Sequence, residues 1–250
     1  MHQCLATCSP LGTVSVIKDL NRPRPRRCAR LKCMKNDVDL KKDVLAELEF
    51  EPRVKVEDIG VSVKDGIVTL TGSVSSYAEK LAASRAAKRL AGVKGLAEDI
   101  MVRLPESSRR TDSDIAAAAV VAIEWITTIP EDTVKITVRD GWLTLEGTVE
   151  GWHQKSAAED AVRNLAGVRG VTNLIVIKPK VAPLDVKGAI RAAFERHALL
   201  DAQQIQVEAN GGTVVLRGNV RSFVEREEAE RAAWIAPGVT SVENRIVLII

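Results

Sequence analysis

The stretch "DGIVTLTGSV" at residues 65–74 recurs as "DGWLTLEGTV" at 140–149 and as "GGTVVLRGNV" at 211–220. Each copy begins with an Asp-Gly or Gly-Gly pair, which tolerates the positive φ angles of a tight hairpin turn. The residues that follow alternate between apolar and polar, which is typical of a strand buried on one face. The chain therefore predicts three matching hairpins, whose surroundings can be compared at equal offsets.

The match extends from the hairpins to whole units. A second motif starts 26 residues after each turn glycine: "GVKGLAEDIMV" from Gly92, "GVRGVTNLIVI" from Gly167 and "GVTSVENRIVL" from Gly238. A helix-like stretch starts 26 residues before each turn: "DLKKDVLAEL" (39–48), "DIAAAAVVAI" (114–123) and "DVKGAIRAAF" (185–194). The prediction is a segment 1–33 followed by three tandem units, named here unit 1 (34–104), unit 2 (109–178) and unit 3 (182–250).

Each unit predicts the order helix, strand, strand, helix, strand. In unit 1, Leu40, Val44 and Leu48 have the spacing of one helix face, and Asp37 or Asp39 is a suitable N-cap. The helix after the hairpin carries mostly alanine on its apolar face, in all three units. The predicted fold class is α+β, with each unit a small three-stranded mixed sheet covered on one face by two helices.

One further glycine lies at an apolar position of the returning strand in every unit, at Gly72, Gly147 and Gly218. A glycine inside a strand is typical of a bulge or of a close approach by another backbone. We expect a bulge here, or a place where a helix backbone crosses the strand.

The charge of the chain is concentrated in the segment 1–33. This segment holds seven Lys/Arg residues against Asp19 alone, so with an overall charge of +3 the remainder is slightly acidic. An acidic body does not favour binding to nucleic acid. The segment also holds all the cysteines, Cys4, Cys8, Cys28 and Cys33. We expect a flexible basic segment or an extension upstream of Met34; the spacings C-x3-C and C-x4-C leave a zinc site as the alternative.

Targeting signals are not readable in the sequence. The basic cluster of the segment 1–33 follows the short apolar stretch "LGTVSVI", which is the wrong order for a signal peptide. The sequence contains no apolar run of the roughly 18 residues that a membrane span needs. The pattern alone predicts a cytoplasmic protein without a transmembrane segment.

The combination of motifs resembles the BON domain (bacterial OsmY and nodulation), in three tandem copies similar to osmotically inducible OsmY-like proteins. The resemblance rests on the "DG-x-V-T-L-x-G-x-V" hairpin, the alanine-rich helix and the ending "GV-x-x-V-x-N-x-I-x-V". Asn173 and Asn244 supply the asparagine of that ending, whereas unit 1 has Glu98. The resemblance covers all three units and leaves only the segment 1–33 outside.

The resemblance implies a non-enzymatic binding protein of osmotic and envelope stress, with no catalytic residues. Its expected partners are phospholipid surfaces or envelope proteins, and its implied location is periplasmic, as the alternative to the cytoplasm. A cytoplasmic scaffold that binds proteins without any lipid dependence is the alternative function.

The residues themselves do not predict chemistry. The histidines His2, His153 and His197 do not recur at equivalent positions, and none neighbours a cysteine or paired carboxylates in sequence. The chain also lacks the glycine-rich signatures of nucleotide-binding loops. We expect no catalytic site, no cofactor and no metal.

Candidate contacts for a lipid surface or a protein partner are basic and aromatic. They are Lys80, Arg85, Lys88, Arg89, Lys94, Trp142 and Trp152. A basic residue near an anionic bilayer contributes about 1 kcal/mol of attraction. The alternative for the basic residues is an ordinary solvated helix face.

The aromatic residues recur at two positions. Tyr77, Trp152 and Phe223 share the start of the second helix, and Phe50 and Trp125 share the end of the first. Both sets are interpreted as staples that hold helix ends to the sheet, or alternatively as a rim that contacts lipid headgroups. Trp142 has the strand parity that points away from the helices, towards a neighbouring unit, a partner or solvent.

Overall fold

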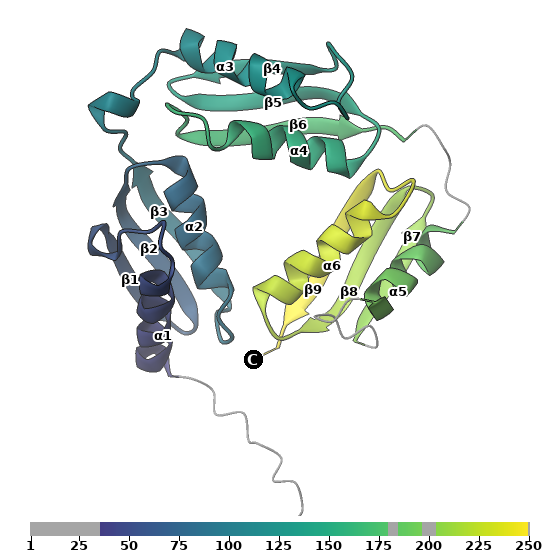
Figure 1. The fold of residues 1–250 in the computed structure, drawn as a ribbon. Helices are drawn as coiled ribbons and strands as arrows, with labels where there is room; N and C mark the ends of the chain where they lie inside the picture. Colours follow the sequence, from purple (N-terminus) through teal and green to yellow (C-terminus); the bar gives the residue numbers. More distant parts are fainter. Residues whose placement is uncertain (1–35, 180–184, 197–203, 250) are drawn as a thin grey trace, which may run out of the picture. The chain divides into compact units, whose positions relative to one another are not determined.

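The computed structural model describes residues 36–179, 185–196 and 204–249. The predictions made for the segment 1–33, including the zinc alternative, lie outside the described residues. Each unit has the predicted order helix, strand, strand, helix, strand (Figure 1).

Three sets of elements make up the units. Unit 1 contains α1 (Asp37–Phe50), the 3-10 turn η1 (Val56–Asp58), β1 (Ile59–Lys64), β2 (Ile67–Val74), α2 (Tyr77–Lys88) and β3 (Gly95–Val102). After η2 (Glu106–Ser108), unit 2 contains α3 (Asp112–Glu124), β4 (Val134–Arg139), β5 (Trp142–Val149), α4 (Trp152–Val162) and β6 (Gly170–Ile177). Unit 3 contains α5 (Val186–Arg196), β7 (Ile205–Asn210), β8 (Thr213–Val220), α6 (Phe223–Ile235) and β9 (Ser241–Leu248).

The three sheets share one topology. The hairpin strands pair antiparallel, and the last strand pairs parallel with the second, so the orders are β1-β2-β3, β4-β5-β6 and β7-β8-β9. The register is also shared, since the pairs that flank the turns are Lys64↔Ile67, Arg139↔Trp142 and Asn210↔Thr213. Parallel strands need a crossover, and the alanine-rich second helix supplies it. The fold class predicted from the sequence is confirmed.

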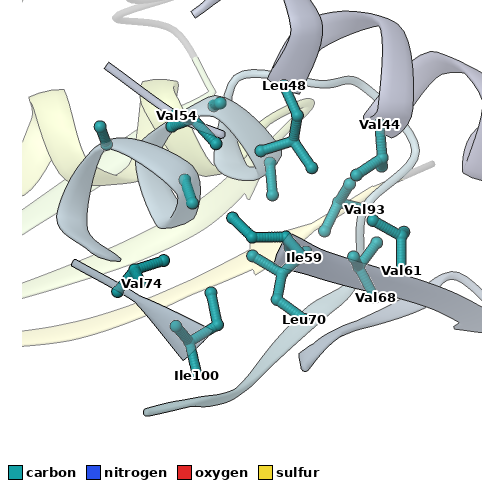
Figure 2. Close-up of a cluster of buried hydrophobic side chains, with 14 of the residues drawn as sticks. Val44, Leu48, Val54, Ile59, Val61, Val68, Leu70, Val74, Val93 and Ile100 are labelled. Carbon is teal, nitrogen blue, oxygen red and sulfur yellow. The ribbon is translucent and has the colours of Figure 1, made fainter. Parts of the chain in front are cut away.

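The core of each unit lies between its helices and one face of its sheet. In unit 1, Val44 and Leu48 of α1 point towards Ile59 and Leu70 of the hairpin (Figure 2). The alanine face of α2 is fully buried, which lets that helix lie close to the strands. The opposite face of each sheet alternates with the core face and is exposed.

The start of the first helix differs from the prediction. Neither Asp37 nor Asp39 is the N-cap, because the Asn36 side chain accepts a hydrogen bond from the Asp39 backbone N–H, at 2.7 Å. The Asp37 carboxylate instead accepts hydrogen bonds from the N–H groups of Asp65 and Gly66 in the hairpin turn. An acidic residue in the first turn can therefore act outside its own helix.

The strand glycines have positive φ angles of 126° at Gly72, 146° at Gly147 and 142° at Gly218. A Cβ atom at these positions would overlap the backbone carbonyls of Asp58, Thr133 and Gln204, respectively. The backbone that approaches is the segment entering the hairpin and not the second helix; in unit 1 this segment is the end of the 3-10 turn η1. Only glycine satisfies both the angle and the contact.

Candidate functional site

The first basic residue of α2 has a structural partner. Lys80 Nζ donates to the carbonyl oxygen of Ile100 on β3, at 3.1 Å. The aligned lysine of unit 2, Lys155, does the same to Ile175 at 2.8 Å. Burial lowers the pKa of Lys155, and the nearby Glu159 carboxylate opposes that shift. These two lysines connect the second helix to the third strand of their own units.

Two further basic residues, Lys88 at the end of α2 and Arg89 directly after it, form ion pairs. Arg89 lies 3.0 Å from Glu47 and 3.0 Å from Glu51, both near the end of α1. Lys88 Nζ lies 2.9 Å from a carboxylate oxygen of Glu227. Arg85 and Lys94 are exposed, and neither takes part in an ion pair within the described residues. Of the five predicted basic contacts, Arg85 and Lys94 thus have the charge most available to an external partner.

Trp142 lies on the uncovered face of the unit 2 sheet, as its parity predicts, and is 53% exposed. Its six-membered ring lies over Gly170, since a Cβ atom built on Gly170 would overlap it. Leu174 and Val176 on β6 are also exposed on this sheet. The uncovered face of unit 2 is therefore partly apolar.

The aromatic residues at the start of the second helices are partly buried. Trp152 packs against the core of its own unit, whereas neither Tyr77 nor Phe223 is among the described residues packed against the core of its own unit. Burial raises the pKa of the Tyr77 phenol. For Trp152 this packing is what the helix-staple interpretation predicts, and it leaves that side chain only partly available as a contact. For Tyr77 and Phe223 the interpretation stays a prediction.

The aromatic residues at the end of the first helices behave differently. Phe50 is 83% exposed and Trp125 is 81% exposed, so the staple interpretation is wrong for this position. Trp125 continues a line of exposed apolar side chains along α3, with Ala117 and Val121 at four-residue intervals. We name Ala117, Val121 and Trp125 the outer line of α3. The sequence signal for it is the absence of polar residues between Asp114 and Glu124.

The buried carboxylate of Glu79 serves the fold. Its oxygens accept hydrogen bonds from the backbone N–H groups of Lys55 and Ser75 and from the Ser75 hydroxyl, at 2.8 to 3.1 Å. A buried charge satisfied in this way stabilises local structure. Among the described residues, no cluster of three or more His, Cys, Asp or Glu is placed to hold a metal ion. Within the same residues, no helix is long and apolar enough to cross a bilayer.

The family model of the BON domain matches the chain three times, at residues 36–103, 111–179 and 185–249. The chain belongs to the BON domain family. It is also similar to osmotically-inducible protein Y of Escherichia coli (strain K12), with 30% identity over 134 residues. That alignment covers 52% of this chain and 67% of the relative.

Solved structures with lower similarity come from CdsD, a structural protein of the type III secretion system of Chlamydia trachomatis. One is 15% identical, covers 84% of this chain and 92% of its own, and has a TM-score of 0.24. The C-terminal domain of CdsD gives 15% identity, 86% and 100% coverage, and a TM-score of 0.23. Scores this low carry no structural argument.

The asparagine of the BON ending forms hydrogen bonds with the second helix in units 2 and 3. Asn173 on β6 donates to the Lys155 carbonyl at 3.0 Å and to the Glu159 carboxylate at 3.1 Å, and it accepts from the Ile175 N–H. In unit 3, Asn244 repeats the contacts with Glu230 at 2.9 Å and with the Ile246 N–H. In units 2 and 3 this asparagine therefore connects the third strand to the second helix.

Proposed function

We propose that this BON protein binds phospholipid surfaces of the bacterial envelope without catalysing a reaction. Family membership supports a binding role over an enzymatic one. The similarity to an osmotically inducible protein supports a role in osmotic or envelope stress, and favours the periplasmic alternative over the cytoplasm.

The observation that carries the proposal is the outer line of α3. Trp125 and Val121 are 81% and 50% exposed on a helix whose opposite face is already buried in the core of unit 2. Indole rings favour the headgroup layer of a bilayer, and an apolar helix face can enter that layer while lying in its plane. Each Å² of apolar surface removed from water contributes about 25 cal/mol.

Electrostatic attraction should contribute less to membrane binding than the apolar outer line of α3. Of the five basic residues predicted as contacts, Arg85 and Lys94 are exposed and form no ion pair within the described residues, and each contributes about 1 kcal/mol near an anionic surface. The other basic residues of α2 are engaged within the protein. On the outer line itself the contact is apolar, so binding should survive moderate salt in part.

Vesicle co-sedimentation of the full chain tests the proposal. We expect binding to vesicles of phosphatidylglycerol and phosphatidylcholine, and a loss of about tenfold in the double variant Val121→Ser/Trp125→Ser. The variant Arg85→Glu/Lys94→Glu should weaken binding at about 50 mM salt and much less at about 500 mM. The matched control is Trp142→Ser, which removes an indole from the sheet face and leaves α3 intact.

Two outcomes would contradict the proposal. The first is a wild-type chain that stays in the supernatant with anionic vesicles at low salt. The second is a Val121→Ser/Trp125→Ser variant that binds vesicles as tightly as wild type while Trp142→Ser does not. Partners captured independently of lipid would instead favour the scaffold alternative.

A further inference from the structure

A groove of about 350 Å³ lies between α3 and β4 in unit 2. Its floor is apolar and consists of Ile123, Ile129, Val134 and Ile136. The volume is at the lower end of the range of ligand sites, about 300 to 1,000 Å³. Val121 and Trp125 do not line this groove, so it is separate from the outer line of α3.

The groove exists because two apolar side chains of unit 1 are replaced in unit 2, one by a smaller apolar residue and one by a carboxylate. Leu45 of α1 and Val56 of η1 pack against the unit 1 core. The aligned residues of unit 2 are Val120, which is smaller, and Glu131, which is exposed.

The strand that supplies part of the floor, β4, also differs in burial from its equivalent in unit 1, β1. The aligned positions Ile59 and Val61 are 5% and 8% exposed, whereas Val134 and Ile136 remain only partly buried. Unit 2 thus leaves apolar surface uncovered where unit 1 closes it.

The rim of the groove is acidic. Glu124, Glu131 and Asp132 all line it and are all exposed. In the part of the chain that the structure describes, none of these three carboxylates takes part in an ion pair. Asp132 has a positive φ of 60°, so the entering segment turns sharply here. Three uncompensated carboxylates around an apolar floor complement a partner that is both apolar and basic.

We propose that this groove binds an extended peptide segment of another protein, which inserts apolar side chains and places Lys or Arg against the three carboxylates. The neighbouring strand supports an extended partner. Among the strands that the structure describes, β4 is an edge of its sheet and pairs only with β5, so backbone groups on its other side can add a strand. An anionic lipid would be repelled by this rim, which argues against a headgroup as the occupant.

Fluorescence anisotropy with the full chain and labelled nonapeptides tests the proposal. The probe peptide alternates valine and lysine; the comparison peptides alternate valine with glutamate, and serine with lysine. We expect the valine-lysine peptide to bind at least about tenfold more tightly than either comparison peptide. Its affinity should fall between about 50 mM and about 500 mM salt.

Substitutions that fill the groove give the matched test. Val120→Leu/Glu131→Val restores the unit 1 residues and should weaken peptide binding about tenfold without lowering the thermal unfolding midpoint. Glu131→Lys, an exposed charge reversal, gives a second readout that does not depend on repacking. Glu146→Val, on the uncovered sheet face, is the control and should bind like wild type.

The outcomes separate this proposal from the lipid proposal. Val121→Ser/Trp125→Ser should keep full peptide affinity whatever it does to vesicle binding. Unchanged binding in both groove variants, or equal binding of the valine-glutamate peptide, would overturn the peptide site. Loss of vesicle binding or of self-association in the filled variant, with peptide affinity unchanged, would also overturn it and assign the groove to lipid or to a second copy.

Discussion

Asp112 and Gly141 are joined by a hydrogen bond of 2.9 Å, in which the backbone N–H of the turn glycine donates to the carboxylate at the start of α3. The neighbouring N–H of Asp140 donates to the other oxygen of that carboxylate, at 2.8 Å. Asp37 makes the same pair of contacts in unit 1. The carboxylate thus satisfies two turn donors and fixes the first helix to the tip of the hairpin.

Removing this carboxylate should destabilise unit 2. We expect Asp112→Ala to lower the free energy of unfolding by about 1–2 kcal/mol, because two charge-assisted hydrogen bonds are lost at a partly exposed site. Urea denaturation, followed by the fluorescence of a chain that retains Trp142 alone, reports on unit 2. The control Glu146→Ala should change stability by less than about 0.5 kcal/mol; equal effects of the two variants would contradict the prediction.

The cap of α3 should make stability depend on pH. Hydrogen bonds from the Thr111 hydroxyl and backbone N–H hold the pKa of Asp114 below its ordinary value of 3.8. Because the folded pKa is the lower one, this contribution is present above the unfolded pKa and is lost as the pH falls through the folded pKa. Carboxyl chemical shifts should show Asp114 titrating below 3.8, and Thr111→Ala should move the midpoint towards 3.8. An unchanged midpoint in the variant would show that Thr111 is not the cause.

The hydrogen bond between the Asn173 amide and the Glu159 carboxylate should make the effects of substituting these two residues non-additive. Asn173→Ala and Glu159→Ala should each destabilise unit 2, and the double variant should lose less than the sum, with a coupling energy of about 0.5–1.5 kcal/mol. A double-mutant cycle in urea measures this coupling. Unit 1 provides the control, because it has Glu98 and Ser84 at the aligned positions and Ser84 donates to Lys80 instead. The pair Glu98 and Ser84 should therefore show no coupling.

The contact between Trp142 and Gly170 should not tolerate a methyl group. Gly170→Ala places a Cβ atom inside the position of the indole ring, so we expect a displaced, more solvent-exposed Trp142 with red-shifted fluorescence. In unit 1, Gly95→Ala is the matched control, because Ile67 would lie at 3.6 Å from the new Cβ atom. Trp142→Ile should restore tolerance to Gly170→Ala. An unshifted spectrum in Gly170→Ala would contradict the inferred ring position.

The sequence predicted the family and the fold of the units because both depend on local, repeated patterns. Turn glycines, alternating strands and an alanine helix face each favour one low-energy local structure. The three copies of the pattern favour the same structures in the same order. The prediction was wrong where neighbouring residues compete for a role. Asn36 rather than Asp37 caps α1, because Asp37 is taken by a turn that lies distant in sequence.

The aromatic positions show the same limit. The sequence predicts that Phe50 and Trp125 lie at helix ends. It does not predict whether the core has room for their side chains, and both are exposed. It shows Val120 and Glu131 only as ordinary substitutions of Leu45 and Val56, and the groove appears once α3 and β4 are packed together.

The sequence by itself determined three copies of one BON module, with their strands, helices and hairpin turns, since periodicity and turn chemistry act over short distances along the chain. The tertiary structure decided which side chains remain available. Burial and ion pairing depend on residues brought together from distant positions, and they engage Lys80, Lys88 and Arg89 while leaving Trp125 and the groove carboxylates in contact with water.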